Sequence, residues 1–175
     1  GITWTGLGAS IFSNVGYGVA WNGTVWVAVG QGTNTIAYSS DGITWIGLGT
    51  NIFNIGNDVA WNGVRWVAVG VGTNTIAYSS DGITWTGLGG NIFSNSGRGV
   101  AFNNDRQHTI NFPTNRSVAV GVGTNTLAYS NDGITWTGLG TNIFTSFGND
   151  VAWNGTMWVA VGRETNSIAY SNDGI

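Results

Sequence analysis

The chain of 175 residues lacks cysteine and lysine and carries little charge of either sign. Without cysteine it can form neither a disulfide nor a thiolate metal site. Charged residues make up 7% of the chain, against about 25% in ordinary globular proteins. All five cations are arginines, the net charge is −3, and no basic stripe is present. The sequence therefore predicts no binding to nucleic acid and no basic amphipathic segment for a membrane surface.

Long hydrophobic runs are also missing, although hydrophobic residues make up 42% of the chain. No run approaches the ~20 apolar residues of a membrane-spanning helix. The chain does not open with a charged segment followed by an apolar one, as a secretion signal would. Its polar residues are mainly Gly, Asn, Ser and Thr rather than Lys and Glu. This composition favours an extracellular or virion-surface location.

What the sequence does contain is an internal repeat. The phrase Gly-Ile-Thr-Trp begins at residues 1, 42, 82 and 133, and Gly174-Ile175 begins it a fifth time. The first and fourth units differ at 12 of 41 positions, so the units are close copies. We therefore interpret residues 1–175 as a single repeat domain, with an insertion at 103–116 in the third unit.

Each repeat predicts four short β-strands. The 30 glycines disfavour helix, and runs rich in Val, Ile, Thr and Trp favour pleated sheets. In the second unit the runs are 58–61, 65–69, 75–79 and 83–86, and Asn62-Gly63 forms a tight turn between the first two. Four antiparallel strands in about 40 residues match one blade of a β-propeller. Runs such as 25–29 are apolar on both faces, as expected for a sheet between two neighbours.

The phase of the repeat bears on ring closure. The chain starts with a fourth strand at residues 2–5 and ends with a third strand at 167–171. Pairing these two would complete the last blade and remove two exposed sheet edges. We therefore expect an all-β propeller of four four-stranded antiparallel blades, closed by the N-terminal strand. The sequence leaves two alternatives open: half of an eight-bladed dimer, and part of a longer chain.

A short acidic turn recurs in every unit. Residues 39–45 read Ser-Ser-Asp-Gly-Ile-Thr-Trp, and the segment recurs at 79–85, at 130–136 and, in part, at 171–175. It resembles the Asp-box, or BNR, repeat of β-propeller proteins, which include sialidases and several non-enzymatic proteins, with one residue fewer between Asp and Gly. The resemblance implies a hairpin between the third and fourth strands. The units also look like the Gly/Trp-rich repeats of large-virus and phage structural proteins.

A short carboxylate at a turn accepts hydrogen bonds from nearby backbone N–H groups. We therefore assign a structural role to the four turn aspartates: Asp41, Asp81, Asp132 and Asp173.

No set of residues in the sequence predicts an active site. Sialidases that share the Asp box use an arginine cluster, a Tyr–Glu pair and an Asp acid, whereas the one glutamate of this chain is Glu164, which we interpret as a local ion pair with Arg163. Only Asp58 and Asp150, at the start of inner strands, are placed to converge as a glycosidase pair would, and glycines replace them in the other two units. Calcium would need more oxygen ligands than this pair supplies. We therefore expect no enzyme activity, no cofactor and no metal.

The units differ mainly in two loops: the connection from the fourth strand to the next blade, and the loop between the second and third strands. In propellers both loops lie on the face where ligands usually bind. The candidate ligand-facing residues are Tyr17, Asp58, Arg98, Asp150, Arg163 and Glu164. The insertion, interpreted as an extended hairpin with solvated charges and a candidate contact point, adds Asp105, Arg106, His108 and Arg116.

These features favour a non-catalytic structural or attachment module with a protein partner, on a viral, phage or secreted assembly. The alternative is a lectin with glycan sites between the blades, because ten tryptophans offer aromatic faces to sugars. Most of these tryptophans fall on strand positions, where we expect them in the core.

Overall fold

The computed structural model describes residues 3–103 and 116–175, and all regular structure in these residues is β. The repeats form four blades. Blade one contains β1 (Val15–Trp21), β2 (Trp26–Gln31), β3 (Ile36–Ser39) and β4 (Ile46–Gly47). Blade two contains β5 (Ile55–Trp61), β6 (Trp66–Val71), β7 (Ile76–Ser79) and β8 (Thr86–Gly87). Blade three contains β9 (Ser96–Phe102), β10 (Ser117–Val122), β11 (Leu127–Ser130) and β12 (Thr137–Gly138). Blade four contains β13 (Phe147–Trp153), β14 (Trp158–Arg163) and β15 (Ile168–Ser171).

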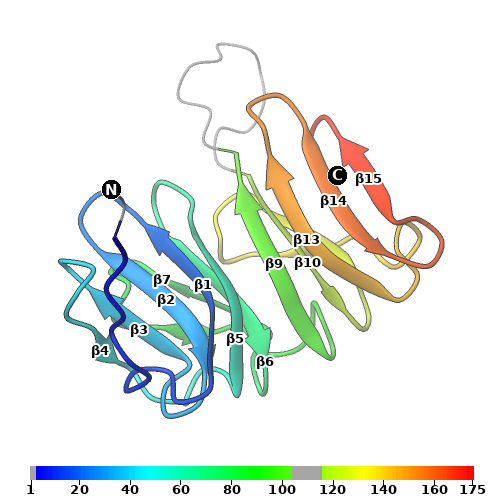
Figure 1. Cartoon of the computed structure of the whole chain (residues 1–175). Helices are drawn as coiled ribbons and strands as arrows, with labels where there is room; N and C mark the ends of the chain where they lie inside the picture. Colours follow the sequence, from blue (N-terminus) through cyan, green and yellow to red (C-terminus); the bar gives the residue numbers. More distant parts are fainter. Residues whose placement is uncertain (1–2, 104–115) are drawn as a thin grey trace.

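Each blade is an antiparallel meander, and the blades fan out from their first strands (Figure 1). β1 contacts β5, β5 contacts β9, and β9 contacts β13, so these four are the inner strands. Two single residue pairs, Val71 with Ser96 and Val122 with Phe147, join blades two to four into an eleven-stranded sheet. The described part of the chain forms no helix, and so none that is long and apolar enough to cross a membrane.

The Asn-Gly turns form the predicted hairpins between the inner and second strands. In blade one the last pair of the ladder is Trp21 opposite Trp26. The side-chain oxygen of Asn22 accepts hydrogen bonds from the N–H groups of Thr24 (2.9 Å) and Val25 (2.8 Å). The glycine that follows this asparagine has a φ of 105°, a conformation that side chains disfavour. Both residues of the Asn-Gly pair therefore shape the turn.

The outer strands differ from the predicted ones. In blade two the strand is Thr86–Gly87, whereas the sequence predicted 83–86. The Asp81 carboxylate accepts hydrogen bonds from the N–H groups of Ile83 (2.8 Å) and Thr84 (2.7 Å). Because their N–H groups bind this carboxylate, these two residues belong to the turn, and the ladder starts beyond them.

Three apolar cores lie between the blades. We call the face of a blade that packs on the next blade along the chain its trailing face, and the face that packs on the preceding blade its leading face. Each core joins the trailing face of one blade to the leading face of the next. Between blades one and two, Val27, Val29 and Ile36 pack against Phe53 and Val59. Equivalent residues form the two cores that follow. The middle blades are thus buried on both faces, as their apolar runs predicted.

The arc of blades is open. Residues 3–14 form no strand, and among the described strands β15 pairs only with β14. The N-terminal segment lies beside blade one, where the Asn34 amide donates a hydrogen bond to the carbonyl of Ile11 (2.8 Å). The N-terminus and β15 lie at opposite ends of the arc (Figure 1). The predicted closure by residues 2–5 is therefore not confirmed, and residue 2 lies outside the described residues.

Candidate functional site

The acidic turns share one geometry. In blade two, one oxygen of Asp81 accepts the hydrogen bonds of Ile83 and Thr84 and a third from the Ser79 hydroxyl (2.9 Å). The same three bonds recur at Asp41 and Asp132. Two of the three recur at the C-terminal turn. Each carboxylate therefore holds its own turn together.

These hydrogen bonds lower the pKa of the turn aspartates. The N–H groups of Thr44 and Ile43, with a serine hydroxyl, lower the pKa of Asp41 to about 2. Burial acts in the opposite direction at Asp81 and Asp132, but the backbone and serine hydrogen bonds outweigh it, so the pKa is lowered there as well. The turns belong to four different blades, which separates the four carboxylates from one another.

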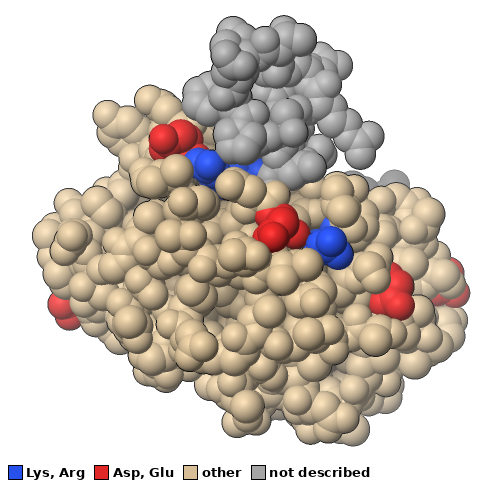
Figure 2. Space-filling view, turned by 180° about the vertical axis from the view of Figure 1, so that it is seen from behind, with Lys and Arg blue, Asp and Glu red and all other residues tan. Residues whose placement is uncertain are grey.

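Charged groups do not gather into one patch. On the face seen from behind, small acidic and basic spots, some of them side by side, are scattered over a largely uncharged surface (Figure 2). Within residues 3–103 and 116–175, no three His, Cys, Asp or Glu side chains are grouped to hold a metal ion.

The two inner-strand carboxylates differ in their surroundings. Asp58 accepts the N–H of Val59 on one oxygen (2.8 Å) and the N–H of Val100 on the other (3.0 Å), so it links blade two to blade three. Burial raises the pKa of Asp58 to about 6; the two hydrogen bonds oppose the rise, and the negative charge of Asp150 adds to it. Asp150 is exposed, and within residues 3–103 and 116–175 it accepts only the N–H of Val151 (2.8 Å). The two predicted carboxylates thus lie close enough to interact electrostatically.

Glycines occupy the same position in blades one and three. A Cβ atom at Gly18 would lie 3.2 Å from the Cα of Asp58, and one at Gly99 would lie 3.0 Å from the Cα of Asp150. Neighbouring inner strands approach this closely because the glycines have no side chain. The position therefore alternates Gly, Asp, Gly, Asp along the arc.

Two of the candidate arginines lie over one aromatic ring. The guanidinium carbon of Arg98 is 4.8 Å from the centre of the Phe147 ring, and that of Arg163 is 5.5 Å from it. Arg98 also donates a hydrogen bond to the side-chain oxygen of Asn149 (3.1 Å). The structure therefore brings Arg98 and Arg163 together, although they are far apart in the sequence.

The two variable loop sets lie on one face, as predicted. We call this the loop face; it comprises residues 9–14, 31–35, 50–54, 71–75, 90–95, 122–126, 141–146 and 163–167. In each blade an asparagine of one loop donates a hydrogen bond to an isoleucine carbonyl of the other: Asn34 to Ile11, Asn74 to Ile52, Asn125 to Ile92 and Asn166 to Ile143.

Glu164 has an unusual backbone. Its φ of 80° is the only positive value at a non-glycine residue in the described part of the chain, and glycines hold the equivalent position in the other blades. Its carboxylate accepts a hydrogen bond from the hydroxyl of Thr145 (3.3 Å). Arg163 does not form the expected ion pair with Glu164, because its guanidinium lies over the Phe147 ring instead. Strained backbone of this kind concentrates at functional sites.

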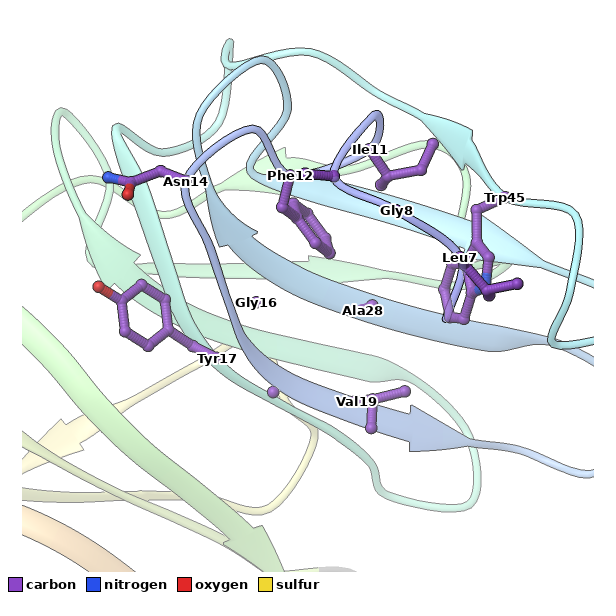
Figure 3. Close-up of a pocket in the computed structure, with 12 residues that line it drawn as sticks. Leu7, Gly8, Ile11, Phe12, Asn14, Gly16, Tyr17, Val19, Ala28 and Trp45 are labelled. Carbon is purple, nitrogen blue, oxygen red and sulfur yellow. The ribbon is translucent and has the colours of Figure 1, made fainter. Parts of the chain in front are cut away.

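Tyr17 lies at the open end of the arc. It is half exposed and lines a pocket of about 600 Å³ together with Leu7, Phe12, Val19 and Trp45 (Figure 3). This pocket is the leading face of blade one, which no other blade covers.

The insertion contributes one described candidate. Arg116 is buried, which corrects the expectation of a solvated charge. It donates hydrogen bonds to the side-chain oxygen of Asn131 (3.1 Å) and to the carbonyl of Asp173, and its guanidinium covers the ring of Tyr129 at 4.9 Å. The contact with Asp173 fixes it to the acidic turn of the next blade, whereas Asn131 and Tyr129 belong to its own blade. The other three candidates lie outside the described residues: Asp105, Arg106 and His108.

Arg65 makes the same connection one blade earlier, and the sequence analysis missed it. Its side chain donates a hydrogen bond to the carbonyl of Asp132 (3.2 Å) and lies 5.9 Å from the centre of the Tyr78 ring. Arg65 and Arg116 both stand directly before a second strand, and this shared position is the signal that could have identified them.

No protein-family model matches the chain, and no curated protein sequence matches it. Solved structures do match. The chain is similar to one in a nidogen/laminin complex, with a TM-score of 0.68 and 15% identity over 91% of this chain and 61% of that chain. It is also similar to the computationally designed Ika4 protein, with a TM-score of 0.64 and 14% identity over 98% of this chain and 100% of that one. A third match is the computationally designed Ika8 protein, with a TM-score of 0.59 and 14% identity over 91% of this chain and 46% of that one. The chain therefore has a β-propeller type of fold and spans only part of the matched chain of the nidogen/laminin complex and of the Ika8 chain.

Proposed function

We propose that this chain is a non-catalytic binding module that holds a protein partner on its loop face, as part of a viral, phage or secreted assembly. The observation that carries this proposal is the position of the sequence differences between the four near-identical blades. The blades share their cores and their acidic turns, and apart from the insertion in the third unit they diverge mainly on the loop face. A surface that varies over a constant scaffold is typical of recognition.

The last blade provides the most distinctive part of this face. Arg163 and Glu164 stand where blade two has Val71 and Gly72. The glutamate adopts its positive φ at an energetic cost, and the arginine lies over Phe147 beside a second arginine. Arginine and aromatic side chains are enriched at protein interfaces. One of the similar structures is a chain of a nidogen/laminin complex, which fits a protein partner.

The absence of enzyme activity is part of the proposal. The acidic turns use their carboxylates on their own backbone, and Asp58 uses both oxygens on N–H groups of two blades. A glycosidase needs two carboxylates free to act on one bond.

A glycan partner ranks second because of where the tryptophans lie. The loop face contains no tryptophan. Three pairs pack against each other at a tilt within the hairpins, with ring centres 4.9 to 5.3 Å apart: Trp21 with Trp26, Trp61 with Trp66 and Trp153 with Trp158. The turn tryptophans donate to glycine carbonyls: Trp45, Trp85 and Trp136.

The proposed module also has a complete last blade. Blade four has no fourth strand in the described residues, and we propose that the segment around Thr5 pairs with β15 to supply one. The resemblance of the turns to the Asp box supports this, because that box joins a third strand to a fourth.

The test is a binding screen of the chain against a protein library, with two matched double variants. Arg163→Val with Glu164→Gly copies blade two onto the loop face of blade four. Thr156→Val with Met157→Arg copies blade two onto the opposite end of the same blade. We expect a partner that binds the chain and the second variant but not the first. Equal binding by both variants would refute the proposal that the partner binds at the loop face. A glycan-array hit, or turnover of an aryl glycoside that Asp58→Asn abolishes, would refute the proposed function.

A further inference from the structure

We propose that a second copy of this chain closes the open arc. In this arrangement blade four of each copy packs on blade one of the other, and Trp4 of each copy completes blade four of the other. The interface is head-to-tail and occurs twice, so two copies form a closed ring.

The chain carries both halves of a fourth apolar core. On the trailing face of blade four, Ile168 is 67% exposed, whereas its equivalent in blade one, Ile36, is 1% exposed. On the leading face of blade one, Val19 is 58% exposed, whereas Val59 in blade two is 4% exposed. Ile36 and Val59 lie in the core between blades one and two, Ile36 on the trailing face of one blade and Val59 on the leading face of the next. The two uncovered faces are therefore complementary in the way that the three internal interfaces already are.

Gly16 is shaped for a neighbour that its own arc does not provide. A Cβ atom at Gly97, in blade three, would lie 2.5 Å from the carbonyl oxygen of Thr75 in blade two. The equivalent glycines of blades two and four are crowded in the same way: Gly56 and Gly148. At Gly16 a Cβ would meet only Phe12, at 3.6 Å. In blade four, Ser167 is the equivalent of Thr75, and its carbonyl is the group that would crowd Gly16 in a closed ring.

Hydrogen bonds between neighbouring inner strands also indicate an interface that is incomplete at the ends of the arc. Between blades two and three, Asn57 donates a hydrogen bond to the carbonyl of Gly97 (2.7 Å), and the N–H of Val100 donates to Asp58 (3.0 Å). These two bonds connect neighbouring inner strands directly.

Asn149 and Asp150 are the equivalents in blade four, whose trailing face no blade of the arc covers. Their partners in the proposed ring are the carbonyl of Gly16 and the N–H of Val19 in the other copy. Asp150 is exposed for the same reason, and its second oxygen accepts no hydrogen bond from the described residues of the free arc.

At the outer edge of the blades, Trp4 is exposed at one end of the arc and a cavity lies beside Gly174 at the other. Trp85 packs into the core between blades and donates a hydrogen bond to the carbonyl of Gly82 (3.1 Å). Blade four has no such tryptophan; a cavity of about 310 Å³ lies beside Gly174, lined by Leu127 and Tyr170 among others. The equivalent tryptophan is Trp4, which is 92% exposed at the other end of the arc.

A second copy fits better than closure of one chain on itself. The two ends lie on opposite sides of the arc (Figure 1). The three internal interfaces repeat the same crowded glycine contacts, so the blades have little freedom to rotate further and bring the ends together.

The inference rests on the proposed completion of blade four, and the experiment separates the two. β3 and β4 pair Tyr38 with Ile46, and the same positions in the completed blade are Tyr170 and Thr5. We suggest mixing two single variants, Thr5→Cys and Tyr170→Cys, under mild oxidation, since the chain has no other cysteine. Thr156→Cys replaces Tyr170→Cys in the control mixture, because it lies at the far end of the same blade.

The expected results are a light-scattering mass of twice 18.3 kDa and a disulfide-linked pair of chains from the first mixture alone. Gly16→Ala should weaken association by at least about tenfold, because the added methyl overpacks the interface while the free arc accommodates it. Gly90→Ala is the matched control, since a Cβ there meets only a carbonyl at 3.8 Å.

Two other outcomes overturn the inference. A monomer in which the Thr5→Cys, Tyr170→Cys double variant forms an internal disulfide shows that one chain closes its own ring, and the proposed function stands. A monomer without any disulfide refutes both the second copy and the completion of blade four. Binding at the loop face is measured independently of either.

Discussion

The pKa of Asp58 predicts that the protein loses stability as the pH rises from 4 to 7. The folded value of about 6 lies about 2 units above the value of 3.8 for a free side chain. Between these two values the folded chain keeps the proton that the unfolded chain has lost. The stabilisation is therefore complete below pH 3.8 and is lost as the pH rises through 6, and at about 1.4 kcal/mol per unit the loss is about 3 kcal/mol.

The turn aspartates act in the opposite direction and in a different window. Their lowered pKa values mean that the stability they provide is present above the usual aspartate pKa and is lost as the pH falls toward 2. The two effects place the maximum of stability near pH 4, below the range where most proteins have theirs.

Urea unfolding between pH 4 and 8 measures this directly, with Asp58→Asn as the test variant. The amide cannot ionise, so the variant should show a much flatter profile over the same window. Asp150→Asn is the control; it should keep most of the slope, because the charge of Asp150 makes the smallest contribution to the raised pKa. If Asp58→Asn keeps the full slope of the parent chain, the assignment of this pH dependence to Asp58 is wrong.

Three further substitutions test the turns, the packing and the strained loop. Asp81→Ala should lower the free energy of unfolding by about 1–3 kcal/mol in urea titrations, because three hydrogen bonds are lost; an equal loss in Asp81→Asn, which keeps one oxygen, would contradict this explanation. Gly97→Ala should cost about 1–3 kcal/mol, because its Cβ would lie 2.5 Å from the Thr75 carbonyl; an unchanged midpoint would show that the blades can shift. Glu164→Gly should raise the free energy of unfolding by up to about 1 kcal/mol by relieving a φ of 80°, and a lower melting temperature would mean that the Thr145 contact outweighs the strain.

Much of the fold could be predicted because the repeat places the same pattern in every blade. Asn62-Gly63 marked a hairpin correctly, and the run 65–69 is buried on both faces, with Trp66 and Ala68 in one core and Val67 and Val69 in the next. The run 25–29 of blade one is covered by another blade on one face alone. The extent of the outer strand could not be predicted, because Asp81 competes with the strand ladder for two N–H groups. Whether the ring closes also could not be predicted, since it depends on the rotation between blades, which side-chain volumes set and the sequence pattern does not show.

The candidate site was predictable in its residues and not in its contacts. Comparing the repeats identified Arg98, Arg163 and Glu164 as variable positions. It could not show that both arginines cover Phe147, because that contact joins two blades. Arg116 was placed among solvated charges because the insertion precedes it, whereas its side chain is buried against the next blade.

The alternation of glycine and aspartate on the inner strands constrains how such a protein can grow by gene duplication. Copying a single blade such as blade two would set two aspartates side by side, where a Cβ atom at Gly18 would already lie 3.1 Å from a carboxylate oxygen of Asp58. Two carboxylates would then share a space made for one. Copying two adjacent blades preserves the alternation. We expect the heritable unit of this architecture to be the pair of blades, so that relatives gain or lose repeats in even numbers.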